Sequence, residues 1–311
     1  MKLFLRFKKS FVIVLISLIL LGIKMEKLRA QTDTTYWQRG AKGTLTFSQV
    51  SLTNWSAGGE NSISLNAFMN MFANYAKGRN TWKNTLELGY GLVDQGDVGF
   101  RKSDDKINFS SQYGYQLNPD NNKLFWSTLF DFKTQFSNGF NFPEGAERVK
   151  ISGLFAPAYL LISTGLEYKP SEFFSVMFSP TSGKITIVSD QDLADLGAFG
   201  VDPGKTTRVE LGTYLTANFK KDIAKNVNLE SRLELFTGYD ENFGNIDVNW
   251  QNALLMKVND WLSANLITQL LYDDDILIDE LDNAGNVISS KPRVQFKQIF
   301  GVGLSYTIGS E

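Results

Sequence analysis

Apolar and polar residues alternate along most of this chain. In the stretch 293–308, every second residue from Phe300 onward is apolar, and the residues between them are mostly small or polar. A period of two predicts a β-strand whose two faces meet different surroundings. The same alternation predicts twelve strands after residue 30, most of them ten to sixteen residues long: Thr44–Thr53, Ser62–Tyr75, Trp82–Asp94, Ile107–Leu117, Trp126–Phe136, Ala158–Tyr168, Phe173–Ser179, Thr206–Lys220, Val227–Tyr239, Ile246–Val258, Trp261–Asp273 and Arg293–Ile308.

The lengths of these strands and of their connections favour a membrane barrel. Strands in soluble sandwiches usually have about five or six residues, whereas a tilted membrane-spanning strand needs roughly nine to eleven. Every second junction is short, namely Lys77–Asn80, Asn118–Asn122, Pro170–Ser171, Lys221–Lys225 and Asn259–Asp260, and the junctions between these are longer. We therefore predict an all-β, antiparallel, up-and-down transmembrane β-barrel of about twelve strands, with both termini on the side of the short turns.

The N-terminal residues predict export from the cytoplasm. Four basic residues precede the apolar run Phe11–Ile23, which is short for a spanning helix, and Ala30 is a small residue suited to cleavage. We expect a signal peptide at residues 1–30, a short periplasmic leader at 31–43 and an outer-membrane barrel domain at 44–311. The predicted location is the bacterial outer membrane, after cleavage of the signal.

Composition narrows the chemistry. The sequence has no cysteine and no histidine, so the commonest general base and the commonest metal ligand are missing. We therefore expect no catalytic residues, no cofactor and no enzymatic activity; carboxylate pairs such as Asp104–Asp105 leave a hydrolase as the least favoured alternative. Without residues 1–30, 24 basic and 32 acidic residues remain, a formal charge of −8, which argues against a nucleic-acid partner.

Charged residues on the predicted inward faces are the first candidate site. Two interpretations stay open. As the lining of a channel, their acidic excess would favour cations; as partners of one another, they would fill a narrow interior, since a twelve-stranded barrel lies between small filled barrels and wide porins. The candidates are Glu87, Asp131, Lys133, Glu210, Glu230, Arg232 and Glu234.

Two long junctions hold the remaining candidates. In the junction after the first strand, Trp55 could contact sugar or lipid, but a turn in which Gly58 and Gly59 supply positive φ is the favoured interpretation. The junction before the last strand begins with Asp273, Asp274 and Asp275. Calcium binds six to eight oxygen ligands, yet the spacing fits no EF-hand loop, and we favour a solvated acidic loop.

Several segments resemble a family of exported β-barrel proteins of Bacteroidetes outer membranes, known only as a domain of unknown function. They are Asn54–Ser62 (NWSAGGENS), Lys102–Asn108 (KSDDKIN), Phe132–Phe136 (FKTQF), Phe155–Tyr159 (FAPAY) and Tyr272–Asp275 (YDDD). The resemblance implies an outer-membrane location and supplies no activity, ligand or catalytic residue.

The barrel pattern predicts a pore or transport component for small solutes. A non-enzymatic structural or accessory subunit of a larger outer-membrane assembly is the alternative. The expected partners are outer-membrane lipid and, for the alternative, other envelope proteins.

Overall fold

The computed structural model describes residues 36–50, 62–95, 99–142, 147–239, 243–281 and 287–309. The predicted signal peptide lies outside these residues, as do Trp55, Gly58 and Gly59. The chain divides into two units, and the larger one, Trp37–Gly309, holds all the strands.

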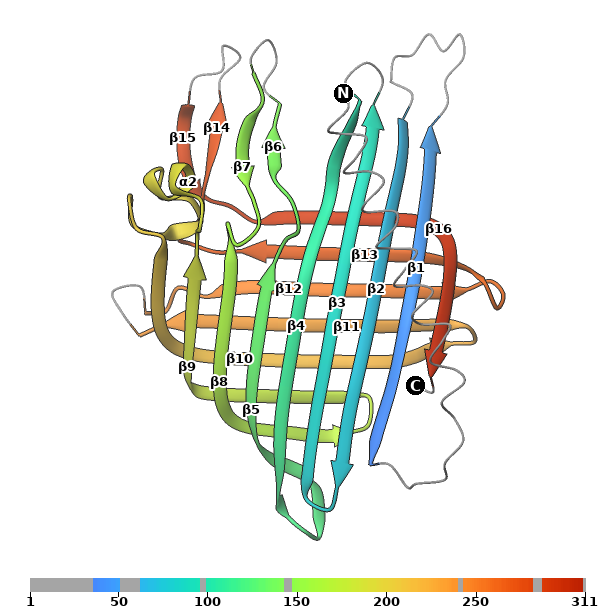
Figure 1. Ribbon diagram of the computed structural model, residues 1–311. Coiled ribbons are helices and arrows are strands. Elements are labelled where there is room, and N and C mark those ends of the chain that lie inside the picture. Colours follow the sequence, from blue (N-terminus) through green and yellow to red (C-terminus); the bar gives the residue numbers. More distant parts are fainter. Residues whose placement is uncertain are drawn as a thin grey trace. The chain divides into compact units, whose positions relative to one another are not determined.

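Twelve long strands form a closed antiparallel barrel (Figure 1), which confirms the predicted fold class. Around the barrel the order is β1, β16, β13, β12, β11, β10, β9, β8, β5, β4, β3 and β2, and β16 pairs with β1 to close it. The strands are β1 (Trp37–Val50), β2 (Ser62–Lys77), β3 (Asn80–Gln95), β4 (Phe100–Asn118), β5 (Asn121–Thr134), β8 (Ala158–Ser171), β9 (Phe174–Ile187), β10 (Thr207–Ala224), β11 (Val227–Gly238), β12 (Asp247–Lys257), β13 (Leu262–Tyr272) and β16 (Gln295–Gly309).

The long connections contain small elements that the alternation did not predict. Two short hairpins, β6 (Gly139–Asn141) with β7 (Val149–Ser152) and β14 (Leu277–Leu281) with β15 (Val287–Pro292), lie at the same end of the barrel as the helix α2 (Gln191–Asp195) in Figure 1. A 3-10 turn, η3 (Ala198–Gly200), follows the helix. Each element is too short to show a strand or helix period in sequence. None of the helices in the described part of the chain has the length and apolar character needed to cross a bilayer.

Several strand boundaries differ from the sequence prediction; β4, for example, begins at Phe100 instead of Ile107, and β5 begins at Asn121 instead of Trp126. Two differences change the domain bounds or the candidate site. β1 begins at Trp37, so residues 37–43, which we assigned to the leader, belong to the barrel; glycines and basic residues there obscure the alternation. β9 continues past Pro180 to Ile187, because the register shifts between residues 179 and 182 and a bulge places Pro180 outside the regular ladder. Proline is tolerated at such bulges since its missing N–H is not needed there.

The outer surface of the barrel is apolar. On β16, Phe300, Val302, Leu304 and Tyr306 are exposed, while Gly301 and Gly303 on the other face are buried. Exposed apolar side chains cover the other strands as well, including Ile162, Leu166, Phe178, Val209, Leu211 and Trp250. The buried residues of the strands therefore face the barrel interior.

Candidate functional site

An ionic network crosses the middle of the barrel interior. It joins Asp131 and Lys133 on β5 to Arg232 and Glu234 on β11, and β8, β9 and β10 separate these two strands in the barrel order. The Arg232 guanidinium lies 2.9 Å from an Asp131 oxygen and 2.7 Å from a Glu234 oxygen. The Lys133 ammonium lies 2.6 Å from Glu234 and 3.3 Å from Asp131. Two cations thus neutralise two buried carboxylates across the interior.

Neutral side chains add hydrogen bonds to Glu234 of this network, whereas the Arg232 Nε is buried without a partner among the described residues. The Tyr214 hydroxyl donates to Glu234 Oε1 at 2.9 Å, and the Asn249 amide donates to Glu234 Oε2 at 2.6 Å. Glu234 therefore accepts bonds from β5, β10, β11 and β12 together. Buried charges are stable only when their remaining lone pairs are satisfied in this way.

Apolar side chains fill the interior around the network. Leu129, Met177, Tyr214 and Phe236 form a buried cluster, with Leu161 packed against it. On the opposite wall, the Phe72 and Phe68 rings occupy the space that a Cβ atom would need at Gly40 and Gly89. Small residues beneath aromatic rings let the two sides of a barrel pack closely. These buried side chains narrow the interior at this depth, while the Lys133 and Arg232 side chains remain 25% and 29% accessible.

A cavity of about 360 Å³ lies between the network and the long connections. Asp131, Lys133, Tyr214 and Glu234 contribute to its lining, together with Pro157 and Ile276 from the connections. Two further ion pairs cross the interior beside it: Lys184 on β9 contacts Asp247 on β12 at 2.6 Å, and Lys297 on β16 contacts Asp104 on β4 at 3.1 Å. The cavity is therefore bordered by charged groups from many strands, and the network separates it from the short-turn half of the barrel.

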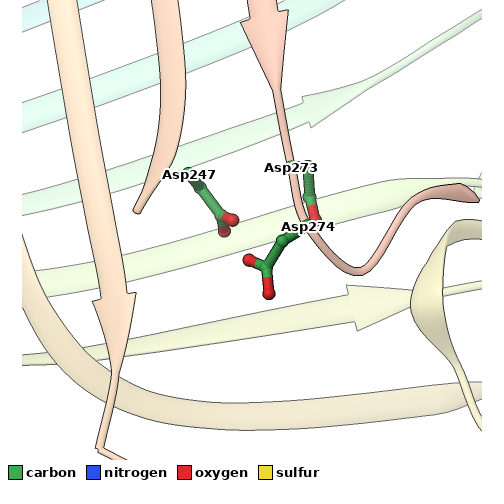
Figure 2. A group of neighbouring side chains, drawn as sticks. All are labelled: Asp247, Asp273 and Asp274. Carbon is green, nitrogen blue, oxygen red and sulfur yellow. The ribbon is translucent and has the colours of Figure 1, made fainter. Parts of the chain in front are cut away.

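Acidic residues gather at the rim of the cavity. Carboxylate oxygens of Asp247, Asp273 and Asp274 lie within 4.8 Å of one another, and Figure 2 shows the three side chains near each other. These three residues could hold a cation, although Lys184 already donates to Asp247. Asp273 and Asp274 are both half-buried, and burial raises the pKa of Asp273. Asp275 lies 2.6 Å from the Arg208 guanidinium.

The structure brings together four of the seven inward candidates, Asp131, Lys133, Arg232 and Glu234, in the network. Glu87 pairs with Lys106 on the next strand, and Glu210 lies 3.3 Å from Lys184. Glu230 is separate: it contacts Lys220, and both side chains are exposed.

The sequence candidates did not include Lys184, Tyr159, Tyr214 or Asn249. Tyr214 and Asn249 lie at inward-facing positions of the alternating pattern in their strands. That pattern was the sequence signal that could have identified them. Lys184 was missed because Pro180 ended the predicted strand before it.

Comparisons with known proteins find barrels of similar size but low identity. An outer membrane channel from Pseudomonas putida F1 is 14% identical, with a TM-score of 0.39, over 91% of this chain and 98% of that chain. The translocator domain of the autotransporter NalP from Neisseria meningitidis is 9% identical, with a TM-score of 0.37, over 92% and 95%. At these identities and scores, neither relative indicates a ligand or an activity for this chain.

No curated protein matches the sequence. The resemblance to a domain of unknown function is confirmed over part of the chain. Residues 47–140 match the family described as "Protein of unknown function (DUF3078)".

Proposed function

We propose that this barrel spans the bacterial outer membrane and provides a gated passage for small polar solutes. The apolar outer surface supports the location, because a spanning barrel needs an apolar band toward lipid and a closed sheet without free edges. Aromatic residues near the short turns support it too: Trp82 and Trp126 are exposed, and the Trp82 indole donates to Ser111. Amphipathic rings of this kind prefer the headgroup region.

The ionic network is the observation that carries the proposal of a gate. A barrel closed only for stability would be served as well by apolar residues, because replacing buried ion pairs with well-packed apolar side chains is often neutral or stabilising. Here two cations and two carboxylates span the interior directly below a cavity that both charged and apolar side chains line. Ionisable groups inside membrane proteins commonly mark the path of a polar solute.

The narrowed interior also favours a second function. A barrel that never opens would suit a structural or accessory subunit bound to other envelope proteins. The two functions differ in one measurable property, which is whether removal of the network allows ions to pass.

Planar-bilayer recordings test the gate. We would replace all four residues with serine (D131S/K133S/R232S/E234S), so that no charge is left without its partner, and use D202S/K205S, an exposed pair, as the matched control. The wild type and the control should show little conductance, and the four-serine variant should show discrete channels. If the four-serine variant still shows the heat-modifiable migration of a folded barrel but remains silent, the gate is refuted and the structural function is supported.

A further inference from the structure

We propose that the cavity above the network binds the protonated amine of a small solute, with Asp273 of the cavity lining, the adjacent Asp274 and the Tyr159 hydroxyl oxygen accepting from the ammonium group. This inference rests on the proposed function and names the solute class that the passage would admit. The cavity volume of about 360 Å³ lies at the lower end of the range for small-molecule sites, which is roughly 300–1,000 Å³.

The lysines of the cavity lining argue against an anionic ligand. Each of the four already contacts a carboxylate: Lys106 pairs with Glu87, Lys133 with Glu234, Lys184 with Asp247 and Lys297 with Asp104. An anion would have to displace one of these carboxylates and leave it buried without a partner, which is unfavourable.

The carboxylates, in contrast, are not all compensated. Asp273 makes no ion pair within the described residues and accepts only from the Asp275 backbone N–H at 3.0 Å. Within the part of the chain that the structure describes, Asp274 accepts only from the Asn245 amide, at 2.6 Å. Burial raises the pKa of Asp273, and the nearby Lys184 ammonium, which is hydrogen-bonded to Asp247, offsets this rise only in part. The rim of the cavity therefore has an excess of negative charge.

Tyr159 supplies an independent observation. Its side chain lines the cavity from the long-connection end of β8. In the described part of the chain its hydroxyl has no hydrogen-bond partner, whereas the Tyr214 hydroxyl on the cavity floor is bonded to Glu234. Tyrosine hydroxyls buried in a protein usually find a partner, so an unpartnered one facing a cavity points to a ligand.

An organic ammonium fits this site better than a divalent metal ion. Calcium requires six to eight oxygen ligands, and the Lys184 ammonium lies 2.6 Å from Asp247, one of the three clustered carboxylates. A divalent ion would have to displace that lysine or share the carboxylate with it. A monovalent ammonium can be bound by Asp273 and Asp274 while Lys184 stays in place. Leu161 and Phe236, which also line the cavity, offer an apolar wall to the rest of the solute.

Ligand-observed saturation-transfer NMR on the full-length barrel in detergent tests the proposal. The probe is n-butylamine, with n-butanol as a neutral probe of the same size. We expect binding of butylamine, and about a tenfold weaker affinity in Asp273→Asn, since removal of one charged hydrogen-bond partner costs about 1.5 kcal/mol or more. Tyr159→Phe should weaken binding by about threefold, as expected for one neutral hydrogen bond. The matched control Asp202→Asn, an exposed carboxylate at residue 202, should leave the affinity unchanged.

Three outcomes would overturn the inference. The first is an equal butylamine signal in the wild type and in Asp273→Asn, which would indicate partition of the probe into the micelle. The second is butanol binding as strong as butylamine binding. The third is binding of calcium ions at these carboxylates without binding of butylamine. Tyr159→Phe keeps the test decisive if Asp273→Asn does not fold. The experiment uses the closed wild-type barrel, so its result does not depend on whether the four-serine variant conducts.

Discussion

Removal of Arg232 should destabilise the barrel more than any other single substitution in the ionic network. Its guanidinium contacts both buried carboxylates, at 2.9 Å and 2.7 Å, and their side chains are only 3% and 6% exposed. In Arg232→Ala, Asp131 and Glu234 would share one remaining cation, Lys133. Breaking a buried ion pair by removing one partner typically costs about 3–5 kcal/mol, and we expect a loss of unfolding free energy in that range.

A double-mutant cycle separates the charge effect from lost packing. In Asp131→Ala/Arg232→Ala the surviving pair, Lys133 and Glu234, is neutral overall. The double variant should therefore lose less stability than the sum of the two single variants, by at least about 1 kcal/mol. Guanidinium-induced unfolding in detergent, followed by tryptophan fluorescence, measures these differences, provided that the slope of the transition is unchanged.

The matched control is the exposed pair of Lys220 and Glu230, whose side chains are 57% and 38% accessible. Exposed pairs contribute about 0–1 kcal/mol, so the same cycle there should show little coupling. Additive losses at Asp131 and Arg232 would refute the reasoning, because they would show that the two charges do not depend on one another in the folded barrel.

Three further predictions concern barrel closure, lipid contact and the long connections. Gly303→Ala should prevent assembly of the barrel, because the new Cβ atom would lie 2.2 Å from a backbone oxygen of β1. The measurement is loss of the heat-modifiable band. Gly43→Ala is the control and should fold normally, because the space at its Cβ position is open. Leu304→Lys should cost roughly 2–4 kcal/mol if this face meets lipid, whereas Leu196→Lys, on a connection and even more exposed, should be neutral; equal effects in bilayers would argue against the membrane location. A hydrogen bond from a lysine lowers the pKa of Asp190, the N-cap of α2, so its stabilising effect is present above the ordinary aspartate pKa and is lost as the pH falls below it. Amide exchange in α2 should accelerate over that acidic range in the wild type and be independent of pH, after correction for intrinsic exchange, in Asp190→Asn.

The alternation in the sequence predicted the strands because each strand separates two environments. Val209 and Leu211 are exposed on the outer face of β10, while Glu210 between them is buried inside. This one-residue contrast survives in sequence regardless of which strands become neighbours. The alternation therefore predicts the number of barrel strands and the residues that face inward. A proline such as Pro180 interrupts the predicted strand because the sequence does not show that a bulge will form there.

The contacts across the interior could not be predicted in the same way. Lys133 and Glu234 are 101 residues apart, and they meet only because the stagger of β5 and β11 brings them to one depth. Alternation gives the direction of each side chain but not its height in the barrel, so the sequence left an open channel and a filled interior as equal alternatives. The cavity, and the place of the unpartnered Tyr159 in its lining, depend on the same heights of the side chains along the barrel, so the sequence could not predict them either.

The network has a second consequence for this fold, because it also fixes the register of the strands. A slip of one residue would turn every inward side chain toward the outer face. For β11 that slip would expose Arg232 and Glu234 on the apolar surface, where charged side chains are strongly disfavoured. An entirely apolar interior would close the barrel but remove this distinction between the two faces. The charges therefore help to keep the two faces of β11 distinct, and a solute that passes must compensate those charges while they separate. A solute with its own ammonium group meets that requirement at Asp131 and Glu234, the two carboxylates that line the cavity floor.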